Sequence, residues 1–273
     1  MKRKCGICEW SLAVTGPSAI EYAGKIGFDG IQLGDLGGAK NCFPMNDPNI
    51  QMTYLEAAKR WKVEIPSMHL FTLVREGGLQ REPDSAEGRR ALLSIEKGLD
   101  ACAVMKIPAL LVTSYDACAI VNERDMECTA RMLKRACAMA EDKGVRLTYE
   151  SILQGEYVGW ILDEVGPQLT LCYDILNPIK FLKGDPAKEI KTFGRGRIDH
   201  VHLKDTPEDM TGFCQLGSGR GRFFESMGVL NEIGFDGWYI TENFYHLPPM
   251  GNTGSVFETA KKDLRIMRGE EKK

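Results

Sequence analysis

The sequence contains 273 residues, of which 43% are hydrophobic and 27% charged, and its formal net charge is -3 at pH 7. A chain of this length can bury one large core, and the lack of a basic excess argues against a nucleic-acid-binding protein. The sequence has no run of 18 or more apolar residues that would indicate a membrane span, and its basic N-terminus lacks the pattern of a secretory signal. We therefore expect a cytoplasmic protein. Nine cysteines spread over predicted helices and strands indicate reduced thiols.

Short strand-like runs alternate with longer amphipathic segments along the chain. The eight strand candidates are residues 4–10, 30–35, 64–70, 109–115, 146–151, 169–174, 198–205 and 238–243. Helical periodicity is clearest over residues 16–27, 49–63, 85–105, 122–144 and 257–269. One unit per about 34 residues is typical of a (β/α)8 barrel, so we predict an α/β TIM barrel with a single domain over residues 1–273. The alternative is an open doubly wound sheet, but "CEWSLAVTG" lacks the Gly-rich phosphate loop that it requires after its first strand.

The run "IDHVHLKD", residues 198–205, has strand periodicity but carries polar groups on one complete face. Alternation places apolar residues on one side of the strand and three polar residues on the other side, namely His200, His202 and Lys204. A buried polar face needs a partner. A metal ion or a bound substrate would supply one.

Four successive predicted strands, from the fifth to the eighth, carry a metal-ligating residue at or near their C-terminal ends. These residues are Glu150, Asp174, His202 and Glu242. The active site of a (β/α)8 barrel lies at this end, so neighbouring strands would bring the four side chains to one rim. This mixed oxygen and nitrogen set suits one divalent ion such as Mn, Mg, Co or Zn. His200 lies one pleat repeat deeper, so we expect it outside the coordination shell. A single carboxylate at a strand end is usually a solvated loop residue or a helix N-cap, and the interpretation as a metal site depends on all four residues occurring together.

Several segments resemble the xylose isomerase-like (β/α)8 family of sugar-phosphate isomerases and epimerases. They are "AGKIGFDGIQL", "YES", "YDILNP", "DHVHLKD" and "QLGSGRGRFFESMGVLNEIGFDGWYITEN". The family includes ketose 3-epimerases, inosose isomerases and dehydratases, hydroxypyruvate isomerases and endonuclease IV. The resemblance implies that the four rim residues bind one divalent metal.

The four candidate metal ligands indicate an enzyme that transfers a proton at the carbon next to a carbonyl group. A divalent ion can hold an α-hydroxy ketone and make the neighbouring C–H acidic. The resemblance implies that Glu150 and Glu242 remove and return the proton through an enediolate, as an isomerase or epimerase of a small sugar, keto-sugar or polyol-derived substrate does. It also implies that Glu156 contacts the substrate.

Two positions depart from the ketose 3-epimerase pattern. Asn177 stands where those enzymes have a substrate-binding histidine, and Glu208 stands where they have an arginine. Asparagine can still bind a hydroxyl, but a carboxylate cannot supply the donors of an arginine. The "HLKD" segment resembles the isomerase and dehydratase branch, in which Lys204 would stabilise an enediolate or contact a substrate oxyanion. The alternative is a lysine that simply pairs with a rim carboxylate.

Two aromatic residues are expected in the pocket, and one glycine-rich motif has two interpretations. We expect Trp10 and His69, at the ends of the first and third strands, to form walls of the substrate pocket. The motif "GSGRGR", residues 217–222, is either a phosphate cradle or a flexible connection into the next helix. A trinuclear endonuclease site needs more histidines than the four in this chain, so we do not expect DNA cleavage.

Two alternatives to an isomerase stay open. One is a lyase or dehydratase on the same scaffold, similar to inosose dehydratase. The other is a non-catalytic sugar-binding barrel. We expect a small carbohydrate as the partner, with neither nucleic acid nor membrane, and a homo-oligomer is compatible with the sequence.

Overall fold

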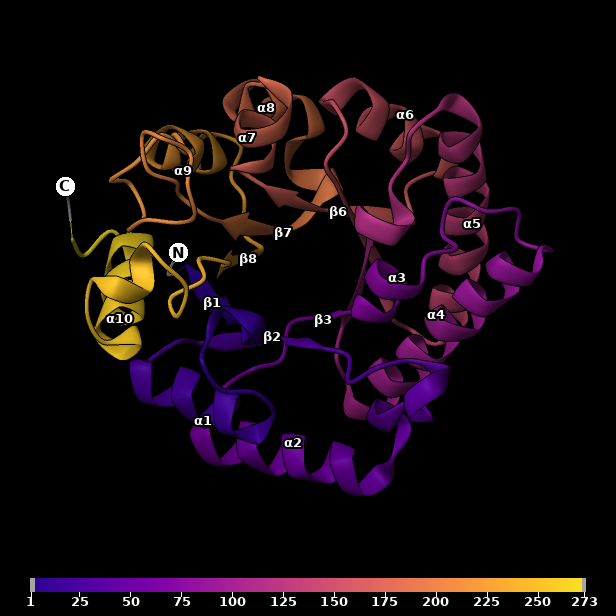
Figure 1. The fold of residues 1–273 in the computed structure, drawn as a ribbon, viewed down its shortest axis with the longest axis horizontal. Helices are drawn as coiled ribbons and strands as arrows, with labels where there is room; N and C mark the ends of the chain where they lie inside the picture. Colours follow the sequence, from indigo (N-terminus) through magenta and orange to yellow (C-terminus); the bar gives the residue numbers. More distant parts are fainter. Residues whose placement is uncertain (1–2, 272–273) are drawn as a thin grey trace. The chain divides into compact units, whose positions relative to one another are not determined.

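Eight parallel strands form a closed barrel in chain order in the computed structural model, which describes residues 3–271 (Figure 1). The barrel closes because β1 pairs with both β2 and β8. The predicted TIM barrel is therefore confirmed. The strands are β1 (Lys4–Cys8), β2 (Gly30–Gly34), β3 (Met68–His69), β4 (Ala109–Ser114), β5 (Arg146–Ser151), β6 (Leu169–Asp174), β7 (Ile198–Leu203) and β8 (Trp238–Thr241).

The helices connect these strands, and the five segments with the clearest helical periodicity are all helices. These five are α1 (Pro17–Ile26), α2 (Pro48–Trp61), α4 (Ala86–Met105), α5 (Glu123–Asp142) and α10 (Val256–Arg268). The others are α3 (Phe71–Glu76), α6 (Gly155–Val165), α7 (Asn177–Leu182), α8 (Pro186–Arg197) and α9 (Phe223–Glu232). The starts of α4 and α5 are capped as their sequences predict, because the side chains of Ser85 and Asn122 accept hydrogen bonds from the first-turn amides.

The third strand is much shorter than the predicted run over residues 64–70. Only Met68 and His69 pair as a strand, and Glu64 makes an isolated bridge to Gly30. Pro66 lies between them and has no backbone N–H to donate to a ladder. The third strand is therefore present where it is predicted, but its predicted length is wrong.

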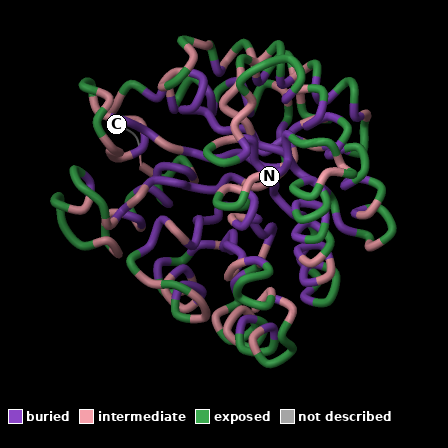
Figure 2. Tube along the Cα trace, turned by 45° about the vertical axis from the view of Figure 1, so that its right-hand side comes forward, coloured by how far each residue is buried: buried purple, intermediate pink, exposed green. Residues whose placement is uncertain are grey.

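Burial follows the strands closely (Figure 2). Every residue of β2 and β4 is buried, as expected for parallel strands that are covered on both faces. The long helices instead bury one side and expose the other, which is why their sequences show a period near 3.6. None of the helices within residues 3–271 is both long enough and apolar enough to cross a membrane.

The described chain forms two compact units. The first contains residues up to Leu33, Tyr54–Ile65 and the chain from Tyr173 onward, and the second contains Gly34–Thr53 and Pro66–Cys172. The single domain over residues 1–273 stays a prediction.

Candidate active site

Three strand ends of the first unit supply the polar residues of the candidate site. Asp174 is the last residue of β6, His202 is the penultimate residue of β7, and Glu242 directly follows β8. All three side chains are buried. Their ligand atoms lie within 4.8 Å of one another, which is close enough to share one ion. Within this unit, the structure therefore brings together the residues that the strand pattern predicts.

The two carboxylate oxygens of Asp174 have different partners. Oδ1 accepts hydrogen bonds from the backbone N–H groups of Leu176 and Asn177, at 2.7 and 2.8 Å. These bonds cap the turn from β6 into α7, in which Leu176 and not Asp174 is the helix N-cap. Oδ2 lies 2.7 Å from Nζ of Lys204. The cap therefore orients the carboxylate so that its second oxygen faces the site.

Lys204 lies between two carboxylates. Its Nζ is 2.7 Å from Oδ2 of Asp174 and 2.6 Å from Oε2 of Glu242. The side chain is only 11% exposed, so water screens these contacts weakly. One of the two interpretations of the sequence is that this lysine pairs with a rim carboxylate. In the structure it pairs with two.

Glu242 is surrounded by donors and positive charge. Burial by itself would raise the pKa of its carboxyl group, but the charges of Lys204 and His202, and their hydrogen bonds, hold the pKa well below its usual range. Oε1 accepts a hydrogen bond of 2.8 Å from the indole Nε1 of Trp10. Trp10, predicted as a pocket wall, thus orients one oxygen of Glu242 while the other faces His202 and Lys204.

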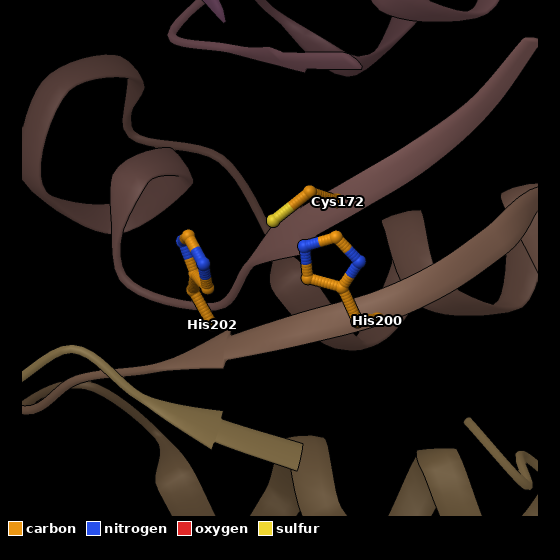
Figure 3. Close-up of side chains that lie close together, drawn as sticks. All are labelled: Cys172, His200 and His202. Atoms are coloured by element: carbon orange, nitrogen blue, oxygen red, sulfur yellow. The ribbon is translucent and has the colours of Figure 1, made fainter. Parts of the chain in front are cut away.

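A buried glutamine connects the two histidines of β7. Oε1 of Gln32 lies 2.7 Å from Nε2 of His202, and Nε2 of Gln32 lies 3.0 Å from Nε2 of His200. Nδ1 of His200 in turn lies 2.9 Å from Oδ1 of Asp199. Both imidazoles project from the same side of β7, while the labelled thiol of Cys172 comes from β6 (Figure 3).

The orientation of Gln32 selects the proton position on His202. Oε1 of Gln32 is an acceptor, so it favours the tautomer with the proton on Nε2 of His202. The thiol of Cys8 also donates to Oε1, at 3.3 Å, which is consistent with this orientation of the amide. Nδ1 of His202 lies on the side of Glu242: the imidazolium form donates from it to the carboxylate, and the neutral form with the proton on Nε2 presents there the lone pair that a metal ligand needs.

The donor atoms fit a divalent ion. Nδ1 of His202 lies 3.1 Å from Oε2 of Glu242. Two ligands at right angles, each about 2.1 Å from an ion, are about 3 Å apart. Two carboxylates and one imidazole are also suitable ligands for Mn, Mg, Co or Zn. His200 is bonded to Gln32 and Asp199, and its place outside the coordination shell stays a prediction.

The second unit holds three further predicted site residues. Glu150 is the penultimate residue of β5, is buried, and pairs in register with Thr113 of β4. His69 ends β3, where its Nε2 lies 3.3 Å from Oγ1 of Thr113 and its ring packs 4.0 Å from that of Phe71. Glu156 lies in the exposed first turn of α6. The roles of these three residues stay predictions.

The two positions that depart from the ketose 3-epimerase pattern differ in their surroundings. Asn177 is buried at the start of α7, and its backbone N–H donates to Asp174. Glu208 is 86% exposed and lies 3.6 Å from Nε of Arg220. Asn177 is therefore adjacent to a site residue, whereas Glu208 pairs on the surface.

The "GSGRGR" loop is organised around a carboxylate of the chain itself. The N–H groups of Gly219 and Gly221 donate to Oδ2 and Oδ1 of Asp205, at 3.1 and 2.7 Å. A Cβ added at Gly219 would lie 2.0 Å from the carbonyl oxygen of Thr206, so glycine is required for this close approach. These two amides are used by Asp205, which argues against the phosphate-cradle interpretation and explains the glycines.

Gln32 was missed in the sequence analysis, although the sequence contains a signal for it. It is the only polar residue between the two glycines of "GIQLG", a strand that is buried throughout. A polar residue inside a buried strand needs a hydrogen-bond partner. That requirement predicts a functional or supporting role but does not say which side chain it contacts.

Comparisons with known proteins agree with this architecture. The family model for xylose isomerase-like TIM barrels matches residues 20–268. A 2-epi-5-epi-valiolone 7-phosphate 2-epimerase from Actinoplanes sp. is 30% identical over 222 residues, which are 81% of this chain and 79% of the relative.

Solved structures show the same fold at lower identity. A D-allulose 3-epimerase from Methylomonas sp. matches with a TM-score of 0.77 and 18% identity, over 99% of this chain and 98% of that protein. A xylose isomerase-like TIM barrel/4-hydroxyphenylpyruvate dioxygenase fusion protein matches with a TM-score of 0.76 and 19% identity, over 97% of this chain. This chain spans only 42% of the fusion protein.

Proposed function

The chain belongs to the xylose isomerase-like TIM-barrel family, and from this premise we propose that it is a divalent-metal-dependent epimerase or isomerase of a small polyhydroxy ketone. The observation that carries the proposal is the convergence of Asp174, His202 and Glu242 at the strand ends, with ligand atoms within 4.8 Å of one another. Buried, convergent titratable groups of this kind are typical of an active site.

We propose that one ion, Mn, Mg, Co or Zn, is held by Glu150 together with these three residues. Glu150 is the penultimate residue of β5 and Asp174 the last residue of β6, and these strands are neighbours in the barrel. A third carboxylate would make the set richer in oxygen, which favours Mn, Mg or Co over a structural zinc site. The bound ion would polarise the carbonyl of the substrate and so acidify the adjacent C–H.

Glu242 is the proposed proton carrier on one side of the substrate. Trp10 holds Oε1 by a 2.8 Å hydrogen bond, and the ionised carboxylate can accept a proton. The C–H bond breaks as the proton moves to a carboxylate oxygen, and its electron pair forms the enediolate. Glu150, protonated from the solvent, would then give a proton from the other side, to the same carbon in an epimerase or to the neighbouring carbon in an isomerase. Glu242 would release its proton to the solvent.

Lys204 and Asn177 are the proposed substrate contacts from the first unit. Lys204 carries a positive charge at the rim and is placed to stabilise the negative charge of the enediolate. Asn177 is buried beside the turn that positions Asp174, where an amide can bind a hydroxyl group. We propose that Glu156, His69 and Trp10 complete the pocket.

The substrate class follows from the printed name of the relative. That protein epimerises a valiolone phosphate, and it shares 30% identity over most of both chains. We propose a sugar-like or cyclic polyol ketone of similar size, with or without a phosphate group. The "GSGRGR" amides already bind Asp205, so a phosphate would need other contacts.

A dehydratase on the same scaffold is the second candidate. The exposed Glu208 replaces an arginine of the ketose 3-epimerase pattern, and "HLKD" resembles the dehydratase branch. Both reactions begin with the same proton abstraction, so they differ only in whether the enediolate is reprotonated or loses hydroxide.

Solvent deuterium incorporation separates these candidates. The test uses ketoses and cyclic polyol ketones, phosphorylated and not, in deuterated water with Mn²⁺, followed by NMR. An epimerase or isomerase gives deuterium on a retained carbon, and the label disappears after treatment with a chelator. Loss of water identifies the dehydratase. A panel that yields neither product nor label, although ligands bind, would support the non-catalytic barrel instead.

A further inference from the structure

Lys204 lies between two of the proposed metal ligands, Asp174 and Glu242. Its ammonium lies within 2.7 Å of one oxygen from Asp174 and one from Glu242, and the three side chains are 11%, 2% and 9% exposed. A buried ammonium is stable only when charge and hydrogen bonds compensate its lost hydration. Two carboxylates provide this compensation.

The two oxygens that bind Lys204 also belong to the proposed metal site. Oε2 of Glu242 lies 3.1 Å from Nδ1 of His202 and 2.6 Å from Nζ of Lys204. A divalent ion bound to these oxygens would lie next to the ammonium. Like charges at such a distance repel strongly when water is largely excluded. The ion and the ammonium therefore compete for the same negative charge.

We propose that Lys204 is an internal counter-cation that exchanges with the divalent metal. The ammonium balances Asp174 and Glu242 when no ion is bound, and it leaves both oxygens when the ion enters. Its flexible four-carbon stem permits this movement without any change in the backbone. The displaced ammonium then faces the substrate. Metal binding would thus place the positive charge where the enediolate forms. The inference rests on the metal site of the proposed function.

Removing the charge of Lys204 tests the competition directly. The Kd for Mn²⁺ is measured by calorimetry on chelator-treated wild-type, Lys204→Met and Lys204→Arg proteins. Without the competing cation, Lys204→Met should bind Mn²⁺ about tenfold more tightly or better. Lys204→Arg keeps the charge, so its Kd should stay within about threefold of wild type. Lys188→Met, an exposed change on α8, controls for a general effect of net charge.

The outcomes separate this inference from the proposed function. Equal or weaker binding by Lys204→Met, with clear binding by wild type, overturns the exchange and leaves the metal site standing. Absence of Mn²⁺ binding in wild type and all variants overturns both.

A crystal structure of the wild-type protein soaked with Mn²⁺ gives a test that needs no variant. We expect Nζ of Lys204 to lie more than about 4 Å from both carboxylate oxygens, beyond the distance of an ion pair. An ammonium that keeps both contacts beside a bound ion would contradict the exchange.

Discussion

Two buried carboxylates of the first unit, Glu242 after β8 and Asp263 in α10, have opposite environments. Burial raises the pKa of Asp263 to about 6, although hydrogen bonds from neutral donors oppose the shift. The neighbouring Lys204 and His202 instead hold the pKa of Glu242 well below its usual range, against the effect of burial. Neutral donors alone do not compensate a buried charge, whereas a cation does.

The two environments indicate different roles for Asp263 and Glu242. Oδ1 of Asp263 accepts bonds from the Gln215 side chain and the Leu216 amide, and Oδ2 accepts bonds from Asn243 and Tyr245. This carboxylate joins α10 to the segments after β7 and β8, as a structural network does. Glu242 instead lies 2.6 Å from Nζ of Lys204 and 3.1 Å from Nδ1 of His202, the contacts on which the proposed proton transfer and metal binding rest.

The largest expected effect is on turnover, in Glu242→Gln. The amide cannot accept the proton and is a weaker metal ligand, so we expect kcat to fall by roughly 1000-fold or more. Steady-state kinetics with the substrate identified by deuterium exchange measure this effect. Glu258→Gln, on the exposed side of α10, should retain wild-type turnover. If Glu242→Gln keeps full activity, Glu242 belongs with Asp263 among the structural carboxylates.

Asp263→Asn should reduce stability rather than turnover. Its amide would turn an N–H₂ group toward donors that now meet an oxygen, so we expect a loss of about 3 kcal/mol in the free energy of unfolding. Urea denaturation measures the change, and Asp142→Asn, an exposed change at the end of α5, should alter it by less than about 0.5 kcal/mol. Unchanged stability in Asp263→Asn would show that Asp263 does not stabilise the folded protein.

Gln32→Leu tests whether Gln32 orients His202 for metal binding. Without the acceptor at Nε2 of His202, the imidazole loses its fixed tautomer and orientation, and we expect Mn²⁺ affinity to fall by about 10- to 100-fold. Calorimetry measures the Kd, with the exposed change Gln168→Leu as the control. Wild-type affinity in Gln32→Leu would show that the amide supports only packing.

The smallest effect is a pH dependence that isolates Asp263. A carboxyl group whose pKa is higher in the folded than in the unfolded protein binds more protons when folded, so stability rises as the pH falls toward the unfolded value. Between pH 7 and 5 this gain is about 1 kcal/mol, and Asp263→Asn lacks it. The difference in unfolding free energy between wild type and variant should therefore grow over this range. A constant difference would mean that the pKa of Asp263 is not raised.

The sequence by itself determined the number and order of the strands and the residues at their ends. Alternating apolar runs and helical periodicity are local patterns, so they located all eight strands and the positions of Asp174, His202 and Glu242. Even the short third strand has a local cause, the proline at position 66.

Only the tertiary structure decided which polar atoms meet. The contact of Gln32 with His202 joins residues 170 positions apart, and Lys204 lies between carboxylates from two other strand ends. The glycines of residues 217–222 suggested a phosphate, but their amides bind Asp205. Periodicity gives the face of a strand on which a side chain lies, whereas its partner depends on strand neighbours, rotamers and competing charges, which exist only once the chain has folded.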